Sequence, residues 1–160
     1  MSDNPLANLD LDAIAKLPVG DQREILRMLD EFKAKRDVEA ARNTFMGYAR
    51  YMFPKFLGPF VEGRHHREMA KIADGINRGE LKRVCIHLPP RHTKSEYWSW
   101  LNPSFYLGHH PNHKIIQVSN TAELAVGFGR RVRDVMESQD YKDLFGGVSI
   151  KADSRSAGRW

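Results

Sequence analysis

The sequence predicts an α/β fold, with a parallel sheet flanked by helices and a helical extension before it. Two apolar runs have the length of buried strands, Lys82–Leu88 and His113–Ser119. A segment with helical spacing of apolar residues follows each run, beginning near Lys94 and spanning Thr121–Ser138. The first of these helices is expected to be interrupted at Pro103. Strands and helices that alternate in this way are typical of a parallel sheet.

The part of the chain before the first predicted strand is expected to be helical. Apolar residues recur every three or four positions in Asp21–Glu39 and in His65–Asn77, and both segments are predicted to be amphipathic helices. Phe45–Phe60 lies between them and is interrupted by prolines and a glycine, so it is predicted to be a short helix followed by a loop. We therefore expect an N-terminal tail and helix, residues 1–44, and a larger domain portion, residues 45–160.

Charge is distributed unevenly along the 160 residues, whose formal net charge is +5. Residues 1–40 carry a net charge of −3, whereas residues 63–95 carry +5. A basic block of this kind suits a nucleotide or a nucleic acid, although a solvated charged face is the other interpretation. No apolar run approaches the roughly 18 residues of a membrane span, and a single cysteine, Cys85, excludes an internal disulfide framework.

The stretch that carries chemistry is Leu88–Ser95, Leu-Pro-Pro-Arg-His-Thr-Lys-Ser, between the first predicted strand and the helix after it. A phosphate-binding loop needs free backbone N–H groups, a lysine that reaches the β- and γ-phosphates, and a hydroxyl that binds Mg²⁺. Lys94 and Ser95 supply the last two. Leu88 and Thr93 stand where the general motif has glycine. Thr93 fits such a loop only if its backbone has negative φ, because a β-branched residue is strongly disfavoured at positive φ.

The wider context of this loop resembles the large subunit of phage terminases, the motors that package DNA. Residues 89–96, Pro-Pro-Arg-His-Thr-Lys-Ser-Glu, are similar to the divergent Walker A loop of that family. Further similarity lies before and after the loop, in residues 60–66, 77–83, 119–125, 128–133, 138–145 and 153–160. The resemblance covers roughly residues 45–160. It implies the N-terminal part of a P-loop ATPase domain, which agrees with the predicted α/β fold.

The resemblance also implies roles for single residues. The expected ATP-binding residues are Pro90, Arg91, His92, Thr93, Lys94 and Ser95. Lys94 would contact the β- and γ-phosphates, and Ser95 would bind the Mg²⁺ that accompanies ATP. Arg91 is the candidate catalytic residue, because phosphoryl transfer is catalysed mostly by positioned charge. A surface ion pair is the other interpretation of Arg91. Upstream aromatic and histidine side chains are expected either to approach the adenine or to pack; they are Phe60, His65 and His66.

In the full-length protein, the family implies ATP hydrolysis coupled to translocation of double-stranded DNA into a procapsid. The implied partners are double-stranded DNA, the small terminase subunit and the portal protein, in the host bacterial cytoplasm and transiently at the procapsid portal. No apolar run ending in paired acidic residues follows the loop, and Asp153 stands in a polar run. We therefore expect an incomplete catalytic site, without the Walker B strand or the nuclease domain. Two alternatives remain open: another P-loop DNA translocase or helicase-like ATPase, and a non-catalytic remnant that only binds DNA or packaging partners.

Three other groups of residues are weaker candidates. The histidines His109, His110 and His113 lack a cysteine or acidic partner at ligand spacing, so a metal site is not favoured. Aromatic residues after the loop are expected in the core rather than stacked on bases; they are Trp98, Trp100, Phe105 and Tyr106. Three arginines on the last predicted helix either contact DNA phosphates or form a solvated face; they are Arg130, Arg131 and Arg133.

Overall fold

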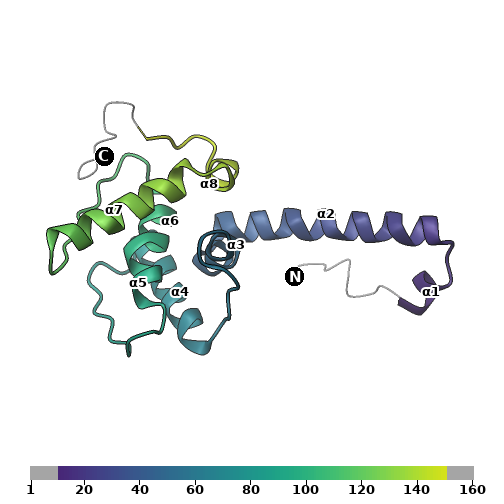
Figure 1. Ribbon diagram of the computed structural model, residues 1–160, viewed down its shortest axis with the longest axis horizontal. Helices are drawn as coiled ribbons and strands as arrows, with labels where there is room; N and C mark the ends of the chain where they lie inside the picture. The colour runs from purple at the N-terminus through teal and green to yellow at the C-terminus, as the bar shows by residue number, and fades with distance from the viewer. Residues whose placement is uncertain (1–10, 151–160) are drawn as a thin grey trace. The chain divides into compact units, whose positions relative to one another are not determined.

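The computed structural model describes residues 11–150, which form helices joined by loops (Figure 1). The chain divides into two compact units, Met1–Arg36 and Asp37–Trp160. None of the helices in the described range combines the length and the apolar character needed to cross a membrane. In chain order the elements are α1 (Leu11–Ala15), α2 (Val19–Asn43), α3 (Phe45–Leu57), α4 (Arg64–Asn77), α5 (Lys94–Glu96), the π-helix η1 (Tyr97–Leu101), α6 (Asn102–His109), α7 (Ala122–Glu137) and α8 (Gln139–Leu144).

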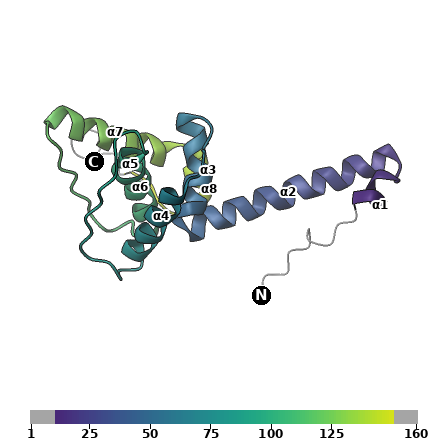
Figure 2. The ribbon, with the colours of Figure 1, turned by 90° about the horizontal axis from the view of Figure 1, so that it is seen from below.

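The prediction of an α/β fold with a parallel sheet is wrong, because the described part of the chain contains no β-strand (Figures 1 and 2). The two predicted strands, Lys82–Leu88 and His113–Ser119, are irregular connections between helices. Within residues 11–150, no backbone hydrogen bond joins one connection to the other. Ile116 and Val118 are each 88% exposed. An apolar, β-branched run favours a strand only where a partner strand is present to complete the backbone pairing.

The predicted helices are confirmed, with shifted ends. α2 contains the predicted Asp21–Glu39, and α4 begins one residue before the predicted start at His65. α7 begins after Thr121, whose hydroxyl accepts a hydrogen bond from the N–H of Leu124 at 3.2 Å. α3 is a helix followed by a loop, as predicted, and it ends just before Gly58 and Pro59, although it continues through Pro54. Periodicity within a single segment therefore located the helices.

A cluster of buried aromatic rings joins α3 to the helical run that starts at Lys94. Phe45 of α3 lies 5.2 Å from Tyr97 and 5.5 Å from Phe105 between ring centroids, both edge to face. Tyr48 lies 5.2 Å from Phe105. All four side chains are fully buried. Each such pair contributes about 0.5–1.5 kcal/mol beyond burial of its surface. The expected core role is confirmed for Phe105, and likewise for the fully buried Trp100.

The helical run from Lys94 to His109 contains a π-helical turn just before Pro103. Because proline has no N–H, the carbonyl of Ser99 lacks the donor that a regular α-helix would provide. The side chain of Gln117 donates to this carbonyl at 2.7 Å. The expected interruption at Pro103 is therefore a local change of helix type rather than a break. Gln117 also holds the connection before α7 against this helical run.

The end of α2 and the start of α3 approach so closely that Gly47 has no room for a side chain. Thr44 is the only residue between the two helices, and its hydroxyl accepts from the N–H of Gly47 at 3.1 Å. A Cβ atom added at Gly47 would lie 2.2 Å from the carbonyl oxygen of Ala40. The entry of α3 into the aromatic core therefore depends on a glycine at this position.

We expect Gly47→Ala to lower the free energy of unfolding by about 1–3 kcal/mol, because the added methyl group forces two backbones apart. Gly127→Ala is the matched control, since a Cβ there meets nothing within 4 Å in the middle of α7. Alanine's higher helix propensity should make that control more stable by about 0.5–1 kcal/mol. Urea denaturation followed by circular dichroism measures both. An unchanged free energy of unfolding in Gly47→Ala would contradict the close approach of α2 and α3.

Candidate phosphate-binding loop

The six predicted phosphate-binding residues, Pro90–Ser95, form a turn that leads into the helical run. Lys94 and Ser95 are the first two helical residues, as the motif requires. The strand expected to support the loop is absent, and an irregular connection from α4 precedes it instead. The position of the loop therefore depends on the helix that follows it and on contacts from α4.

The sign of the backbone angle φ alternates along the loop. Arg91 and Thr93 lie in the left-handed region, with φ of 62° and 54°, and His92 between them does not. Lys94 then begins the right-handed helix. Residues that alternate in this way direct successive N–H groups into one concavity, which is the form of known anion-binding nests and phosphate loops. The negative φ that Thr93 was expected to need in such a loop is not found. Arg91 and Thr93 are two strained residues in a loop without glycine.

Backbone donors are available at the end of this loop. Within the described residues, the N–H groups of Thr93, Lys94, Ser95 and Glu96 donate no hydrogen bond. The first turn of any helix leaves such donors without partners in the helix, and the helix dipole adds partial positive charge there. A negatively charged oxygen is the natural acceptor for this set of donors.

The side chains of the loop add positive charge. Arg91 and Lys94 are both exposed, and no carboxylate of residues 11–150 forms an ion pair with either. The surface ion pair considered for Arg91 is therefore not found in the described structure. Ser95 is also exposed. The chemistry of this set fits a magnesium-bound triphosphate, because two cations and a hydroxyl accompany the backbone donors.

Thr93 is held from α4 by His66. The Nε2 atom of His66 lies 2.5 Å from the hydroxyl oxygen of Thr93, and that hydroxyl donates to the carbonyl of His92 at 2.7 Å. The threonine oxygen therefore accepts from His66. The Nδ1 atom of His66 accepts from the N–H of Gly63 at 2.8 Å. These two bonds, here called the His66 bridge, require a neutral ring that carries its proton on Nε2.

The surroundings of His66 favour that neutral ring. The side chain is buried, and its ring lies 5.1 Å from Phe60 and 5.2 Å from Tyr97 between centroids. Burial lowers the pKa of His66, and the neighbouring His65 lowers it further. The packing considered for His66 is found in the structure, together with a contact to the loop that we did not predict, and its approach to adenine stays a prediction.

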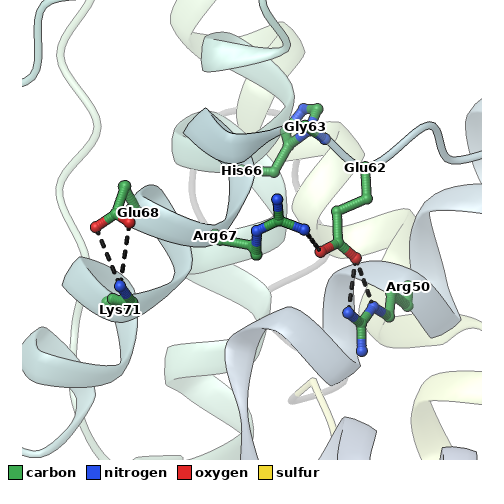
Figure 3. A network of polar contacts seen from close by, with 7 residues as sticks. All are labelled: Arg50, Glu62, Gly63, His66, Arg67, Glu68 and Lys71. Carbon is green, nitrogen blue, oxygen red and sulfur yellow. Dashed lines mark hydrogen bonds and ion pairs between the residues drawn. The ribbon is translucent and has the colours of Figure 1, made fainter.

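Glu62 fixes the segment that carries Gly63. Its carboxylate lies between Arg50 of α3 and Arg67 of α4, at 2.8 Å from Arg50 Nε and 2.9 Å from Arg67 Nη1 (Figure 3). The hydrogen bond from Arg50 is the main cause that lowers the pKa of Glu62. The side chain is mostly shielded from solvent, at 19% exposure. Sequence reasoning missed all three residues, because the spacing from 50 to 62 carries no recognisable pattern.

The remaining candidates are distributed around the helical body. Arg131 lies over the ring of Trp100 at 5.8 Å, and Arg133 lies 3.5 Å from Asp134. The role of these arginines toward DNA stays a prediction. The expectation for Asp153 concerns a segment, 151–160, outside the described residues.

Comparison with models of protein families, with curated proteins and with solved structures finds no match to this chain. The resemblance to terminases therefore rests on the sequence motifs, and the activity that it implies is a proposal.

We expect Thr93→Gly to be more stable than Thr93→Val by about 1 kcal/mol, with stability measured by urea denaturation. Both variants remove the hydroxyl that contacts His66, so their difference reports on the backbone. Glycine adopts the left-handed conformation without strain, whereas valine is β-branched like threonine. Equal stability of the two variants would contradict the left-handed conformation of residue 93.

Proposed function

We propose that the loop Pro90–Ser95 binds the phosphates of ATP, as part of a DNA-packaging motor of the terminase type. The observation that carries phosphate binding is the alternating backbone of the loop, which ends in unpaired N–H donors at the start of a helical run. Lys94 stands at that start with no carboxylate partner in the described residues. This combination suits an anion with several oxygens better than a neutral ligand.

Each side chain of the loop has a distinct task in this proposal. Lys94 neutralises the β- and γ-phosphates, and the hydroxyl of Ser95 binds the Mg²⁺ that accompanies them. When bound, Mg²⁺ would offset part of the negative charge of the phosphates. Arg91 supplies a second cation for the γ-phosphate, the group whose charge is redistributed when it is transferred. The proposal does not require a sheet, because α4 and the aromatic core support the loop in its place.

The motor itself is proposed from the sequence context of the loop. The Pro-Pro-Arg-His lead before Thr-Lys-Ser, together with the flanking segments in residues 45–160, supports a terminase large subunit. The partners are then double-stranded DNA, the small terminase subunit and the portal protein. The location is the host bacterial cytoplasm and, during packaging, the procapsid portal. Hydrolysis in such a motor also needs acidic groups that hold Mg²⁺ and orient the attacking water.

We expect Lys94→Ala to weaken binding of MgATP at least about tenfold, measured by isothermal titration calorimetry. A charge-assisted hydrogen bond contributes about 1.5–3 kcal/mol, and about 1.4 kcal/mol corresponds to a factor of ten. Lys114→Ala is the matched control, since it removes an exposed lysine from the connection before α7 and should leave binding unchanged.

Competition separates binding of phosphate from binding of the base. Inorganic triphosphate should displace MgATP from the wild-type chain, and adenosine should not. Binding that survives Lys94→Ala, or that adenosine displaces, would contradict the assignment of Pro90–Ser95 as the phosphate loop.

A further inference from the structure

We propose that His66 is a positioning residue for the phosphate loop: its neutral ring bridges Gly63 and Thr93 and keeps Thr93 in the left-handed conformation that aims the loop donors. The proposal rests on the proposed function where it concerns nucleotide affinity. Its structural half, the His66 bridge itself, can be tested on the wild-type chain without any nucleotide.

Each hydrogen bond of the bridge has a defined donor and a defined acceptor. The N–H at Nε2 of His66 donates to the hydroxyl of Thr93, and the hydroxyl donates onward to the carbonyl of His92. The threonine side chain is thereby fixed on both sides. Left-handed threonine is strained, and strain of this kind persists only where the surroundings determine the conformation. In the described structure, the bridge is the contact that can hold Thr93 in this conformation, because it comes from a separate helix.

Side-chain contacts also fix the segment at the other end of the bridge, where Gly63 lies. Gly63 is the residue before α4, and its N–H is the donor to Nδ1 of His66. Glu62 next to it is fixed by Arg50 and Arg67, whereas the pair formed by Lys71 and Glu68 lies further along α4 and takes no part (Figure 3). A continuous series of contacts therefore runs from α3, through the start of α4, to the phosphate loop.

Protonation of His66 breaks this series at one defined point. A ring that is protonated on both nitrogens cannot accept from the N–H of Gly63. Three titratable groups face the ring: Glu62 and His65, which lie close to it in the chain, and His92 from the loop. Tyr97 of η1 packs against the ring. Glu62 favours the charged ring, but burial and the two histidines oppose it, and the pKa of His66 is lowered.

The direction of the pH dependence follows from that lowered pKa. A histidine whose pKa is lower in the folded chain than in the unfolded chain stabilises the fold fully above its ordinary pKa of about 6.5. That contribution is lost as the pH falls through the lowered value. The bridge is therefore complete at neutral pH, and the loop loses its support under mildly acidic conditions.

The first test is a nitrogen–proton NMR correlation spectrum of the imidazole rings in the wild-type chain. The expected result is a His66 ring with its proton on Nε2 at pH 7.5 and a titration midpoint below about 6.5. A proton on Nδ1, or a midpoint above that value, would overturn the bridge irrespective of nucleotide binding. Because this measurement needs no substitution, it does not depend on whether any variant folds.

The second test compares His66 variants in the affinity for MgATP between pH 5.5 and 7.5. His66→Phe keeps a ring against Phe60 and Tyr97 but removes both hydrogen bonds, and it should bind about tenfold more weakly at pH 7.5. His66→Gln keeps an N–H donor that does not titrate, and it should bind within about threefold of the wild type.

The pH dependence is read from the ratio of the MgATP affinities of the wild type and His66→Gln, because protonation of ATP itself affects both equally. This ratio should fall as the pH falls. His113→Gln is the matched control: it removes an exposed histidine from the connection before α7, away from the groups that face His66, and should keep the pH profile of the wild type.

The outcomes separate the two proposals. If Lys94→Ala abolishes binding while His66→Phe binds like the wild type, the positioning role is overturned and the phosphate loop stands. If His66→Gln shows the same pH profile as the wild type, the positioning role is likewise overturned. If Lys94→Ala binds normally, the phosphate loop fails, and the ring tautomer in the NMR spectrum still decides for or against the bridge.

Discussion

The contact of Phe45 and Tyr48 with Tyr97 and Phe105 is the constraint on which the proposed phosphate loop depends. These buried rings fix the helical run that begins at Lys94 relative to α3. In a loop supported by a strand, a neighbouring sheet would set the position of the first phosphate-binding residue. In this structure the position of the loop is set by the helical run that follows it. Lys94 and Ser95 at its start are exposed, whereas Tyr97 and Trp100 in its next turn are buried in the aromatic core. Helix α4 supplies the remaining support through His66.

Three features coincide at this loop, and their coincidence is the physical case for a binding role. Arg91 and Thr93 are left-handed without being glycine, successive N–H groups end without partners, and Lys94 has no anion beside it in the described structure. The left-handed conformation of Arg91 and Thr93 costs stability, whereas the unpaired N–H groups and the exposed Lys94 are solvated by water and remain available to a ligand. A bound phosphate would satisfy the donors and the cations together, and the strained backbone is the conformation that presents them. Folded proteins keep such local conflicts mainly where function requires them.

Sequence reasoning succeeded where the determining information was local. α4 and α7 follow from periodicity within one segment, and Lys94 with Ser95 was correctly placed at a helix start. It failed where a distant partner decides the outcome. His113–Ser119 has the composition of a strand but finds no strand to pair with among residues 11–150, and the conformation of Thr93 depends on a histidine 27 positions earlier. No spacing rule connects such residues, because their proximity is a product of the packed core.

Binding of phosphate by the backbone of this loop can be measured in amide NMR spectra during a titration with inorganic triphosphate and Mg²⁺. We expect the largest chemical-shift changes at the N–H groups of Thr93, Lys94, Ser95 and Glu96, which are unpaired in the described structure. The amide signals in the middle of α7 should not change. Unchanged signals in the loop, or changes concentrated at His113–Ser119 instead, would show that the loop does not bind phosphate.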